Sequence, residues 1–459
     1  MRVSATIYTS DKLPLEDTAV AQLRDAACLP PARKVLATPD IHQGYGVPIG
    51  AVVGLQDAIL PAAVGYDINC GMRLIGTELS RRDIDADALA HSIARDVPLG
   101  QGHDNVHLND RQLEAVLERG LQAVPLLAES VSHRAWEGYD PDEFAQDLQH
   151  VERQGRLPGL LAAVPDHARQ KGAHQLGTLG GGNHFIEIQM VEVVFDADLA
   201  RYFNLEPGRI VVMIHSGSRR LGYQIADEYM RRAARRRGAS GRQRDLAYLT
   251  ADESDFDLYV GAMHAAGNFA YVNRQIMTLL VRRCFRRMLG PLPLPLLYDV
   301  SHNMAQFEEH LDGWLWVHRK GATRAFGPRR MAGGPFADVG QPVIIPGSMG
   351  TASYLLVGAD DSEETLCSVN HGAGRTMSRA AALGKVNRRT GQVIRAPAIT
   401  DDEFKRSMRG ITLVAHDKHA VKEEAPAAYK DIDAVIDVVC RCGLARPVAR
   451  LKPLAVLKG

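Results

Sequence analysis

Four short segments of this chain end in side chains that can bind a metal ion, and they constrain the fold more than any other feature. The segment 64–73 reads Val-Gly-Tyr-Asp-Ile-Asn-Cys-Gly-Met-Arg, so the Asp67 carboxylate precedes the Cys70 thiol by three residues. Such a short turn lets an oxygen and a sulfur converge on one ion. The other three segments are apolar runs that close on a histidine: His184, His215 and His302. If all these side chains meet, most of the chain must fold as one unit.

The number of candidate ligands bears on how many ions the site holds. Asp67, Cys70 and the three histidines are more ligands than one tetrahedral ion with an open position uses. A two-metal centre bridged by the Cys70 thiolate would use them all. Thiolate and imidazole are soft or borderline donors, so ligand type alone favours zinc. The alternative is that these side chains are ordinary core residues.

The composition fits a single large globular domain. The 459 residues, 46% hydrophobic and 24% charged, can bury a large core. No linker divides the chain, so we expect one catalytic domain over 1–459. No apolar run reaches the roughly 18 residues of a membrane span, and the N-terminus lacks an apolar signal core. The six cysteines show no disulfide framework. We therefore expect a cytoplasmic protein with no membrane contact.

The hydrophobic pattern predicts an α+β fold with mixed or antiparallel sheets, because the regular strand–helix alternation of a doubly wound fold is missing. Residues 81–170 are helical and polar, which indicates a peripheral helical insertion. Residues 38–50 are rich in glycine and proline and predict a loop, and about the last hundred residues show no single pattern. We expect strands within 51–79 and at 185–195, 209–215, 294–300, 314–318, 342–346 and 353–357. We expect helices at 15–27, 221–237 and 254–289, the last opened by a capping box at 254–257.

Arginines are clustered although the formal net charge is zero. Seven arginines and no acid lie within 230–244, and further groups follow at 282–287 and 319–330. Such clusters can neutralise phosphates. The alternative is a solvated helix face, and charge alone does not separate the two interpretations.

Loops of small residues indicate nucleotide chemistry. The segments 180–183 and 346–353 can bring backbone N–H groups and hydroxyls close to phosphates, although the P-loop pattern is absent. Within 369–379, His371 is flanked by small residues, and Arg375 and Arg379 would lie one turn apart on a helix. An exposed imidazole beside two guanidiniums suits attack on phosphorus while the arginines hold the charge.

Taken in order, these motifs resemble the RtcB family of RNA ligases. The resemblance spans about residues 35–80 and 175–459, while 81–170 carries no family motif. It rests on Gly-Tyr-Asp-Ile-Asn-Cys-Gly, Gly-Gly-Gly-Asn-His-Phe-Ile-Glu, Ile-His-Ser-Gly-Ser-Arg, Val-Ser-His-Asn, Arg-Lys-Gly-Ala-Thr, Pro-Gly-Ser-Met-Gly-Thr-Ala-Ser-Tyr, His-Gly-Ala-Gly-Arg and Leu-Lys-Gly.

The resemblance implies a GTP- and manganese-dependent ligase for tRNA splicing or RNA repair. Such enzymes join RNA 2′,3′-cyclic phosphate or 3′-phosphate ends to 5′-hydroxyl ends. A histidine, here His371, becomes guanylylated and passes GMP to the RNA 3′-phosphate, and the 5′-hydroxyl then displaces GMP. Two Mn²⁺ ions per chain would share Cys70, replacing the zinc that ligand type favours. Asp67 and His184 would complete one site, and His215 and His302 the other.

The resemblance also implies a GTP pocket and RNA contacts. In the pocket the Glu187 carboxylate suits guanine, because it can accept from both N1–H and the 2-amino group. The pocket residues would be Asn183, His184, Phe185, Ile186, Glu187, His302, Asn303, Pro346, Gly347, Ser348, Met349, Ser353, His371, Gly372, Ala373, Gly374, Tyr429 and Lys458. RNA contacts are expected from Arg219, Arg375 and Arg379. We expect a monomer that binds GTP and RNA ends, with an archease-type activator as a candidate partner.

Two other functions remain open at this point. A metal-dependent phosphoesterase acting on cyclic or terminal RNA phosphates would need the metals but not His371. A non-catalytic protein that binds RNA ends would need only the arginines. The intact His-Gly-Ala-Gly-Arg segment that begins at His371 favours the ligase.

Overall fold

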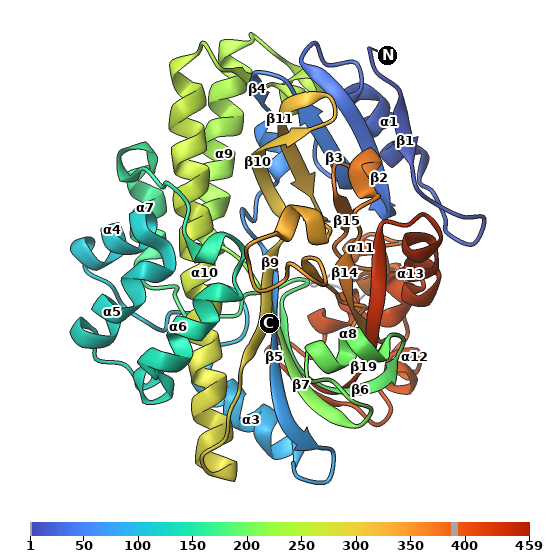
Figure 1. Cartoon of the computed structure of the whole chain (residues 1–459). Helices are drawn as coiled ribbons and strands as arrows, with labels where there is room; N and C mark the ends of the chain where they lie inside the picture. Colours follow the sequence, from blue (N-terminus) through green and yellow to red (C-terminus); the bar gives the residue numbers. More distant parts are fainter. Residues whose placement is uncertain (1, 387–392) are drawn as a thin grey trace.

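Two mainly antiparallel sheets form the centre of the protein (Figure 1). The computed structural model describes residues 2–386 and 393–459. The larger sheet has the order β13-β14-β19-β6-β7-β5-β9, with β18 beside β19. Its strands are β5 Gly71–Ser80, β6 Phe185–Val194, β7 Arg209–Ser216, β9 Leu296–Ser301, β13 Pro342–Ile345, β14 Ser353–Gly358, β18 Thr412–Ala415 and β19 Ala445–Lys458. Only β18 and β19 pair in parallel among these described strands, so the predicted α+β class is confirmed.

The smaller sheet has the order β1-β2-β3-β11-β10. Its strands are β1 Ala5–Ile7, β2 Ala32–His42, β3 Ile49–Leu55, β10 Asn303–His310 and β11 Gly313–Lys320. Short two-stranded pairs complete the described strands: β4 Ala58–Ile59 with β8 Leu249–Thr250, β12 Ala322–Arg324 with β15 Ser368–Asn370, and β16 Lys385–Val386 with β17 Val393–Arg395.

The long helix α10, Ser254–Leu289, separates the larger sheet from the predicted helical insertion. Figure 1 shows α4 to α7 gathered on the side of α10 that faces away from the sheets. The middle of α10 is buried on almost all sides, and its buried residues include the polar Asn268 and Arg274 as well as apolar side chains. The insertion comprises α3 Ala86–Asp96, α4 Asp110–Arg119, α5 Val124–Ser130, α6 Pro141–Gln149 and α7 Asp166–Gly172.

The remaining helices lie beside the sheets or at the edge of the pocket described below. None of the described helices combines the length and the apolar character needed to cross a membrane. They are α1 Asp17–Ala26, α2 Pro61–Val64, α8 Ala197–Tyr202, α9 Arg219–Arg236, α11 Arg379–Leu383, α12 Asp401–Ser407 and α13 Ile432–Arg441.

The register of the larger sheet gathers the candidate ligands at one edge. Gly71 at the start of β5 pairs with Ser216 of β7 and with Ser301 of β9. Phe185 at the start of β6 pairs with His215. The ligand residues stand at or beside these positions, so strands far apart in sequence bring them together.

Many of the clustered arginines pair with carboxylates, some in the interior and others at the surface. Arg282 pairs with Asp147 of the insertion at 2.7 Å, and Arg283 pairs with Asp96 at 2.6 Å. On α9, Arg232 pairs with Glu228 at 2.8 Å. Arg231, Arg236, Arg237, Arg319, Arg324, Arg329 and Arg330 also form ion pairs with carboxylates. These pairs favour a structural role over a phosphate-binding surface.

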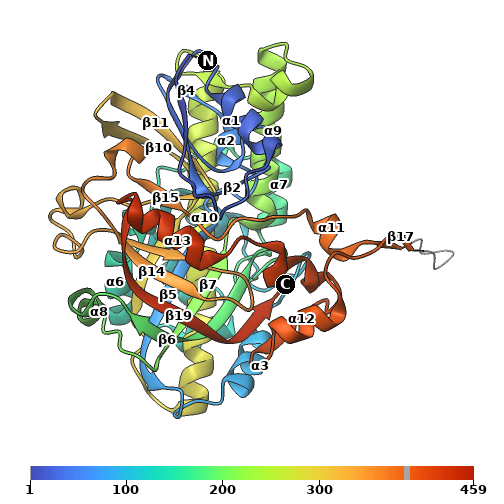
Figure 2. The same cartoon turned by 90° about the vertical axis from the view of Figure 1, so that its right-hand side faces the viewer.

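Three local predictions are wrong, and one long strand was not predicted. Residues 38–42 belong to β2, whose irregular pairing between Ala37 and His42 accommodates the proline that suggested a loop. The strand β19 crosses the centre of the larger sheet within the segment that showed no pattern (Figure 2). It was obscured because Pro447 and Pro453 lie beside register shifts, where a missing N–H is tolerated.

The other two errors concern helix starts. The capping box at 254–257 is absent, because α10 begins after Glu253 without a side-chain cap. Arg375 and Arg379 do not share a helix, since α11 begins only at Arg379. Arg375 instead pairs through its backbone with Tyr429.

Candidate functional site

A cavity of about 540 Å³ opens where the ligand-bearing edge of the larger sheet meets β2, β11 and the segment that carries His371. Most residues predicted for the site line it. They are Asp67, Cys70, Asn183, Phe185, His215, His302, Asn303, Pro346, Gly347, Ser348, Met349, His371, Gly372, Ala373, Gly374, Arg375, Arg379, Tyr429 and Lys458. Behind this lining lie His184, Ile186, Glu187, Ser353 and Arg219.

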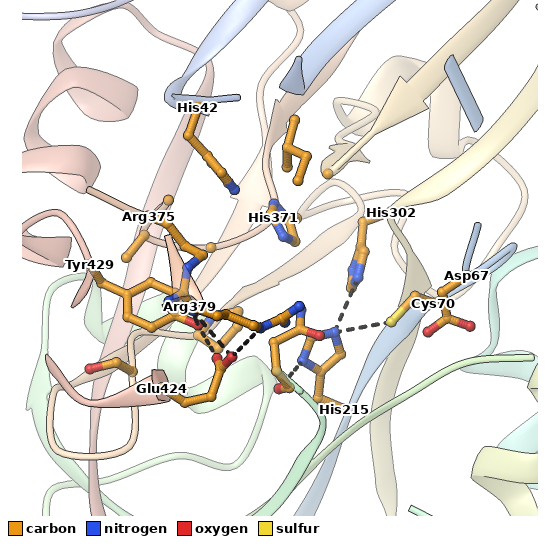
Figure 3. A pocket seen from close by; sticks show the side chains of 18 of the residues that line it. His42, Asp67, Cys70, His215, His302, His371, Arg375, Arg379, Glu424 and Tyr429 are labelled. Carbon is orange, nitrogen blue, oxygen red and sulfur yellow. Dashed lines mark hydrogen bonds and ion pairs between the residues drawn. The ribbon is translucent and has the colours of Figure 1, made fainter. Parts of the chain in front are cut away.

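Two groups of possible metal ligands share Cys70, as the sequence predicts. One group is Asp67, Cys70 and His184, and the other is Cys70, His215 and His302, with the ligand atoms of each within 4.8 Å of one another. Cys70 Sγ lies 3.3 Å from His184 Nε2 and 3.2 Å from His215 Nε2. Figure 3 shows His215 and His302 converging on Cys70. One thiolate can therefore contribute to two neighbouring ions.

The second nitrogen of two of these rings is held by the backbone. His184 Nδ1 lies 2.9 Å from the Leu179 carbonyl oxygen, and His215 Nδ1 lies 3.1 Å from that of Asn183. A proton on each Nδ1 donates to these carbonyls and leaves Nε2 free to bind metal. Among the described residues His302 Nδ1 has no partner.

The electrostatics of the group fit a bound cation. Burial raises the pKa of the Cys70 thiol well above its usual value, and the Asp67 carboxylate raises it further. Burial lowers the pKa of His215 and of His302 well below the usual value, so both rings are neutral. Neutral imidazoles, a thiol and a carboxylate packed this closely make a set of donors that a divalent ion would complete.

The backbone is shaped to bring Asp67 and Cys70 onto this edge. Asn69 adopts a left-handed φ of 53°, which turns the chain between the two ligands. Its side chain donates to the Gly267 carbonyl at 2.7 Å. A side chain at Gly217 would collide with the Asp67 carboxylate, because its Cβ would lie 2.4 Å from Oδ1.

One buried arginine ties the metal-binding loops together. Arg274 of α10 donates to the backbone oxygens of Asn69 at 2.8 Å and Ser216 at 3.0 Å. The same guanidinium pairs with Asp299 at 2.8 Å, and both side chains are fully buried. This arrangement links the turn before β5 to the end of β7.

His371 is oriented by a carboxylate that the sequence reading missed. The Nδ1–H of His371 donates to Asp40 Oδ2 at 2.8 Å, while Thr38 donates to Asp40 Oδ1 at 2.6 Å. Burial opposes ionisation of Asp40, but the hydrogen bonds from His371 and Thr38 hold its pKa below the usual value. The contact fixes the tautomer that leaves Nε2 of His371 unprotonated.

Glycines let the backbone close around this histidine. Gly321 has a φ of 61°, and a Cβ there would lie 2.3 Å from the Ile49 side chain and 3.0 Å from the His371 ring. The rings of His302 and His371 are 4.8 Å apart. The candidate nucleophile therefore lies beside the group formed by Cys70, His215 and His302.

The two arginines near His371 are engaged by Glu424. Arg375 Nη1 donates to Glu424 Oε1 at 3.2 Å, and Arg379 Nε donates to the same oxygen at 3.1 Å. The Tyr429 hydroxyl donates to Glu424 Oε2. In Figure 3, Tyr429 and the two arginines lie on one side of His371, and Asp67 and Cys70 on the other. Arg219 does not line the cavity, but its positive charge helps to lower the pKa of Asp67.

A buried polar cluster lies near Lys458, which lines the cavity. Gln189 donates to Glu187 at 2.5 Å and to Ser353 at 3.0 Å. Burial raises the pKa of Glu187 to about 8 and lowers that of Lys458 to about 8. A ligand that donates N–H groups to Glu187 would reverse the first shift, because such bonds favour the charged carboxylate.

Sequence reasoning also missed other residues that line the cavity, among them His42, Lys320 and Glu424. Lys320 follows the arginine of the Arg-Lys-Gly-Ala-Thr motif, which was the one available signal. Its Nζ donates to the backbone oxygens of Tyr45 and Val47, and burial lowers its pKa to about 7. Glu424 stands in a segment without a recognised motif, and His42 in the segment predicted as a loop.

Comparison with known proteins decides the family. A family model described as tRNA-splicing ligase RtcB matches residues 22–459. A tRNA-splicing ligase RtcB from Archaeoglobus fulgidus is 41% identical over 100% of this chain and 95% of its own length. The chain belongs to the RtcB family. RtcB ligases from Thermococcus kodakarensis and Methanococcus maripaludis are 40% and 37% identical over the same shares.

The RtcB match extends beyond the motifs that carried the resemblance. It includes the helical segment 81–170, where the sequence showed no family motif. This RtcB chain has one further group of possible ligands among the described residues: His310, Glu363 and Cys367. Glu363 Oε2 lies 3.0 Å from His310 Nδ1, and Glu308 Oε2 lies 3.1 Å from Nε2. Because the protein already engages both ring nitrogens, this group is internally satisfied.

Proposed function

We propose that this RtcB protein is a GTP- and manganese-dependent RNA ligase that acts in tRNA splicing or RNA repair. It joins RNA ends bearing a 2′,3′-cyclic phosphate or 3′-phosphate to ends bearing a 5′-hydroxyl. The observation that carries the proposal is the contact of 2.8 Å between His371 Nδ1 and Asp40. This contact prepares Nε2 as a nucleophile beside the paired metal-ligand groups.

A 2′,3′-cyclic phosphate end is first opened by water to a 3′-phosphate and a 2′-hydroxyl. His371 then takes part in the two transfers of GMP. Its Nε2 attacks the α-phosphorus of GTP, which forms a P–N bond and releases pyrophosphate. An oxygen of the RNA 3′-phosphate then attacks the same phosphorus, so the P–N bond breaks and GMP moves to the RNA. In the last step the 5′-hydroxyl oxygen attacks the RNA 3′-phosphorus, GMP leaves, and a 3′,5′ phosphodiester forms.

The charged groups around the cavity support these transfers. Asp40 accepts a hydrogen bond from Nδ1–H of His371, and its negative charge offsets the positive charge that develops on the imidazole. Two manganese ions, held by Asp67, Cys70 and His184 and by Cys70, His215 and His302, would neutralise phosphate oxygens. Arg375 and Arg379 lie at the opposite side of His371 and are proposed to contact RNA phosphates, as is Arg219.

The nucleotide end of the cavity suits guanine. Glu187 accepts from N1–H and the 2-amino group in this proposal, and Tyr429 flanks the base. Lys458 is fully buried near Glu187 and Glu424, so it can favour their charged forms when the nucleotide is bound. The loop 346–349 and the glycines 372 and 374 leave space for the phosphates.

The test separates the ligase from a phosphoesterase. Purified protein is incubated with GTP, Mn²⁺ and two RNAs, one ending in a 2′,3′-cyclic phosphate and one beginning with a 5′-hydroxyl. We expect joined RNA, and we expect His371→Ala to yield none. Opening of the cyclic phosphate without joining, at equal rates in both proteins, would favour the phosphoesterase instead.

Several cellular features belong to the same proposal. We propose that the protein works in the cytoplasm as a monomer on tRNA halves or broken RNA ends, with an archease-type activator as a candidate partner. Light scattering during size-exclusion chromatography tests the monomer, and multiple-turnover ligation without added protein tests the need for an activator.

A further inference from the structure

Three tyrosines form a continuous aromatic row at the edge of the cavity. The Tyr66 and Tyr223 rings are stacked, with centroids 4.7 Å apart and an interplanar angle of 19°. Tyr45 lies against Tyr66 at 5.6 Å and a tilt of 52°. Tyr223 is 48% exposed although Tyr66 covers one of its faces. The row thus leads from the cavity to solvent and leaves one aromatic face open.

The row begins beside the metal-ligand groups. Tyr66 immediately precedes Asp67, and both Tyr45 and Tyr66 line the cavity. The backbone oxygen of Tyr45 accepts a hydrogen bond from Lys320 Nζ. Lys320 precedes Gly321, where an added Cβ would lie 3.0 Å from the His371 ring. Asp67, which follows Tyr66, lies on the opposite side of His371 from Tyr429, where the guanine site is proposed (Figure 3).

The charges around the row are mixed. Arg231 pairs with Asp227 at 3.1 Å, which neutralises a guanidinium on the same helix as Tyr223. Burial and the Asp245 carboxylate raise the pKa of Tyr45 to about 12, while burial and Tyr223 raise that of Tyr66. Arg244 acts on both tyrosines and partly offsets these shifts in pKa. The neutral rings can offer an RNA base stacking but no ionic contact.

A ring stacked on a neighbour and open on its other face suits an unpaired base. Every nucleobase has a flat face, so aromatic rows bind single strands with little regard to sequence. Burial of a tyrosine in the core usually covers both faces and satisfies the hydroxyl. Tyr223 instead stands on the second turn of α9, stacked on Tyr66 and 48% exposed.

We propose that Tyr66 and Tyr223 form a stacking site for an unpaired base of the RNA strand whose end enters the metal side of the cavity. This inference rests on the proposed function and names a site for its RNA substrate. The base lies on the outer face of Tyr223 and extends the row formed by Tyr45 and Tyr66. The strand end then reaches the metal-ligand groups without crossing the nucleotide end.

The experiment measures RNA affinity and GTP labelling in the same proteins. Tyr223→Ala is compared with Tyr223→Trp, which keeps a stacking face, and with Tyr202→Ala as a matched control. Tyr202 is 44% exposed and lies outside the cavity. Each protein is titrated with single-stranded RNA that carries 2-aminopurine at each terminal position in turn, at two salt concentrations.

Tyr223→Ala should weaken RNA binding about tenfold, the lower part of the range for one stacked base. The loss should be equal at both salt concentrations, because stacking releases few counterions. The 2-aminopurine at one position should be quenched by the wild type and by Tyr223→Trp but not by Tyr223→Ala. Tyr202→Ala should match the wild type, and labelling by GTP should be unchanged in all variants.

Unchanged RNA affinity and quenching in Tyr223→Ala, with a wild type that joins RNA, would overturn the stacking site alone. A loss that disappears at high salt would also overturn it, since that would indicate a phosphate contact. A wild type that binds RNA but neither labels nor joins would refute the proposed function separately.

Discussion

Replacing Asp40 by asparagine tests how His371 is prepared for attack. The Nδ1–H of His371 donates to Asp40 Oδ2 at 2.8 Å, and Asp40 is fully buried. Asparagine has nearly the same shape but only one acceptor oxygen, which Thr38 and His371 would both require. If the amide NH₂ faces the ring, the proton moves to Nε2 and blocks the nucleophile.

The hydrogen bond between His371 and the charged Asp40 sets the expected size of the loss in rate. A hydrogen bond to a charged group contributes about 1.5–3 kcal/mol, which corresponds to a rate change of roughly 10- to 150-fold. The assay is single-turnover transfer of labelled GMP from saturating GTP to the protein. Thr38→Val is the control, because it removes a donor to Asp40 but keeps the carboxylate that holds His371.

Metal content must be equal in the wild type and in Asp40→Asn, since Asp40 is outside both ligand groups. A variant that labels within about twofold of the wild type, with both metals present, would refute the assigned role of the carboxylate.

Three further predictions concern the metal groups, the pH dependence of stability and the buried ion pairs. Cys70→Ala should reduce bound metal from two ions to one or fewer, because both groups share its sulfur; two retained ions by metal analysis would contradict the bridge. Burial would lower the pKa of His310, but hydrogen bonds with Cys367 and two glutamates raise it to about 9. Its contribution, at most about 3 kcal/mol, is complete below the ordinary pKa of about 6.5 and is lost as the pH rises through about 9. Urea unfolding at both ends of this range should show the loss in the wild type and not in His310→Gln. Arg274→Met should cost about 3–5 kcal/mol in the same assay, because it leaves Asp299 with one cation fewer in a buried site.

Two of the candidate metal ligands could be placed from the sequence because each stands at the end of an apolar strand. His215 follows one apolar run and His302 follows another, so the sequence alone predicts that both lie at strand ends. Their convergence was only an expectation. It depends on the register that pairs Gly71 with Ser216 and Ser301, and no local pattern encodes such a register.

The partners of the site residues could not be predicted in the same way. Asp40 lies 331 residues from His371, within a segment whose glycines and proline pointed to a loop. Arg282 and Asp147 are 135 residues apart, so the arginine clusters looked unpaired in sequence. Long-range ion pairs follow from tertiary packing, which composition does not reveal.

The central claim is that Nε2 of His371 carries GMP between GTP and RNA. The direct measurement is incubation with α-labelled GTP and Mn²⁺ without RNA, followed by mapping of the labelled peptide. We expect a label on His371 that is labile to acid and stable to alkali, as a phosphoramidate is, and none in His371→Ala although both metals remain bound. That variant should still join RNA whose 3′ end already carries GMP. A label that persists in His371→Ala, most plainly on Lys458, would contradict the claim.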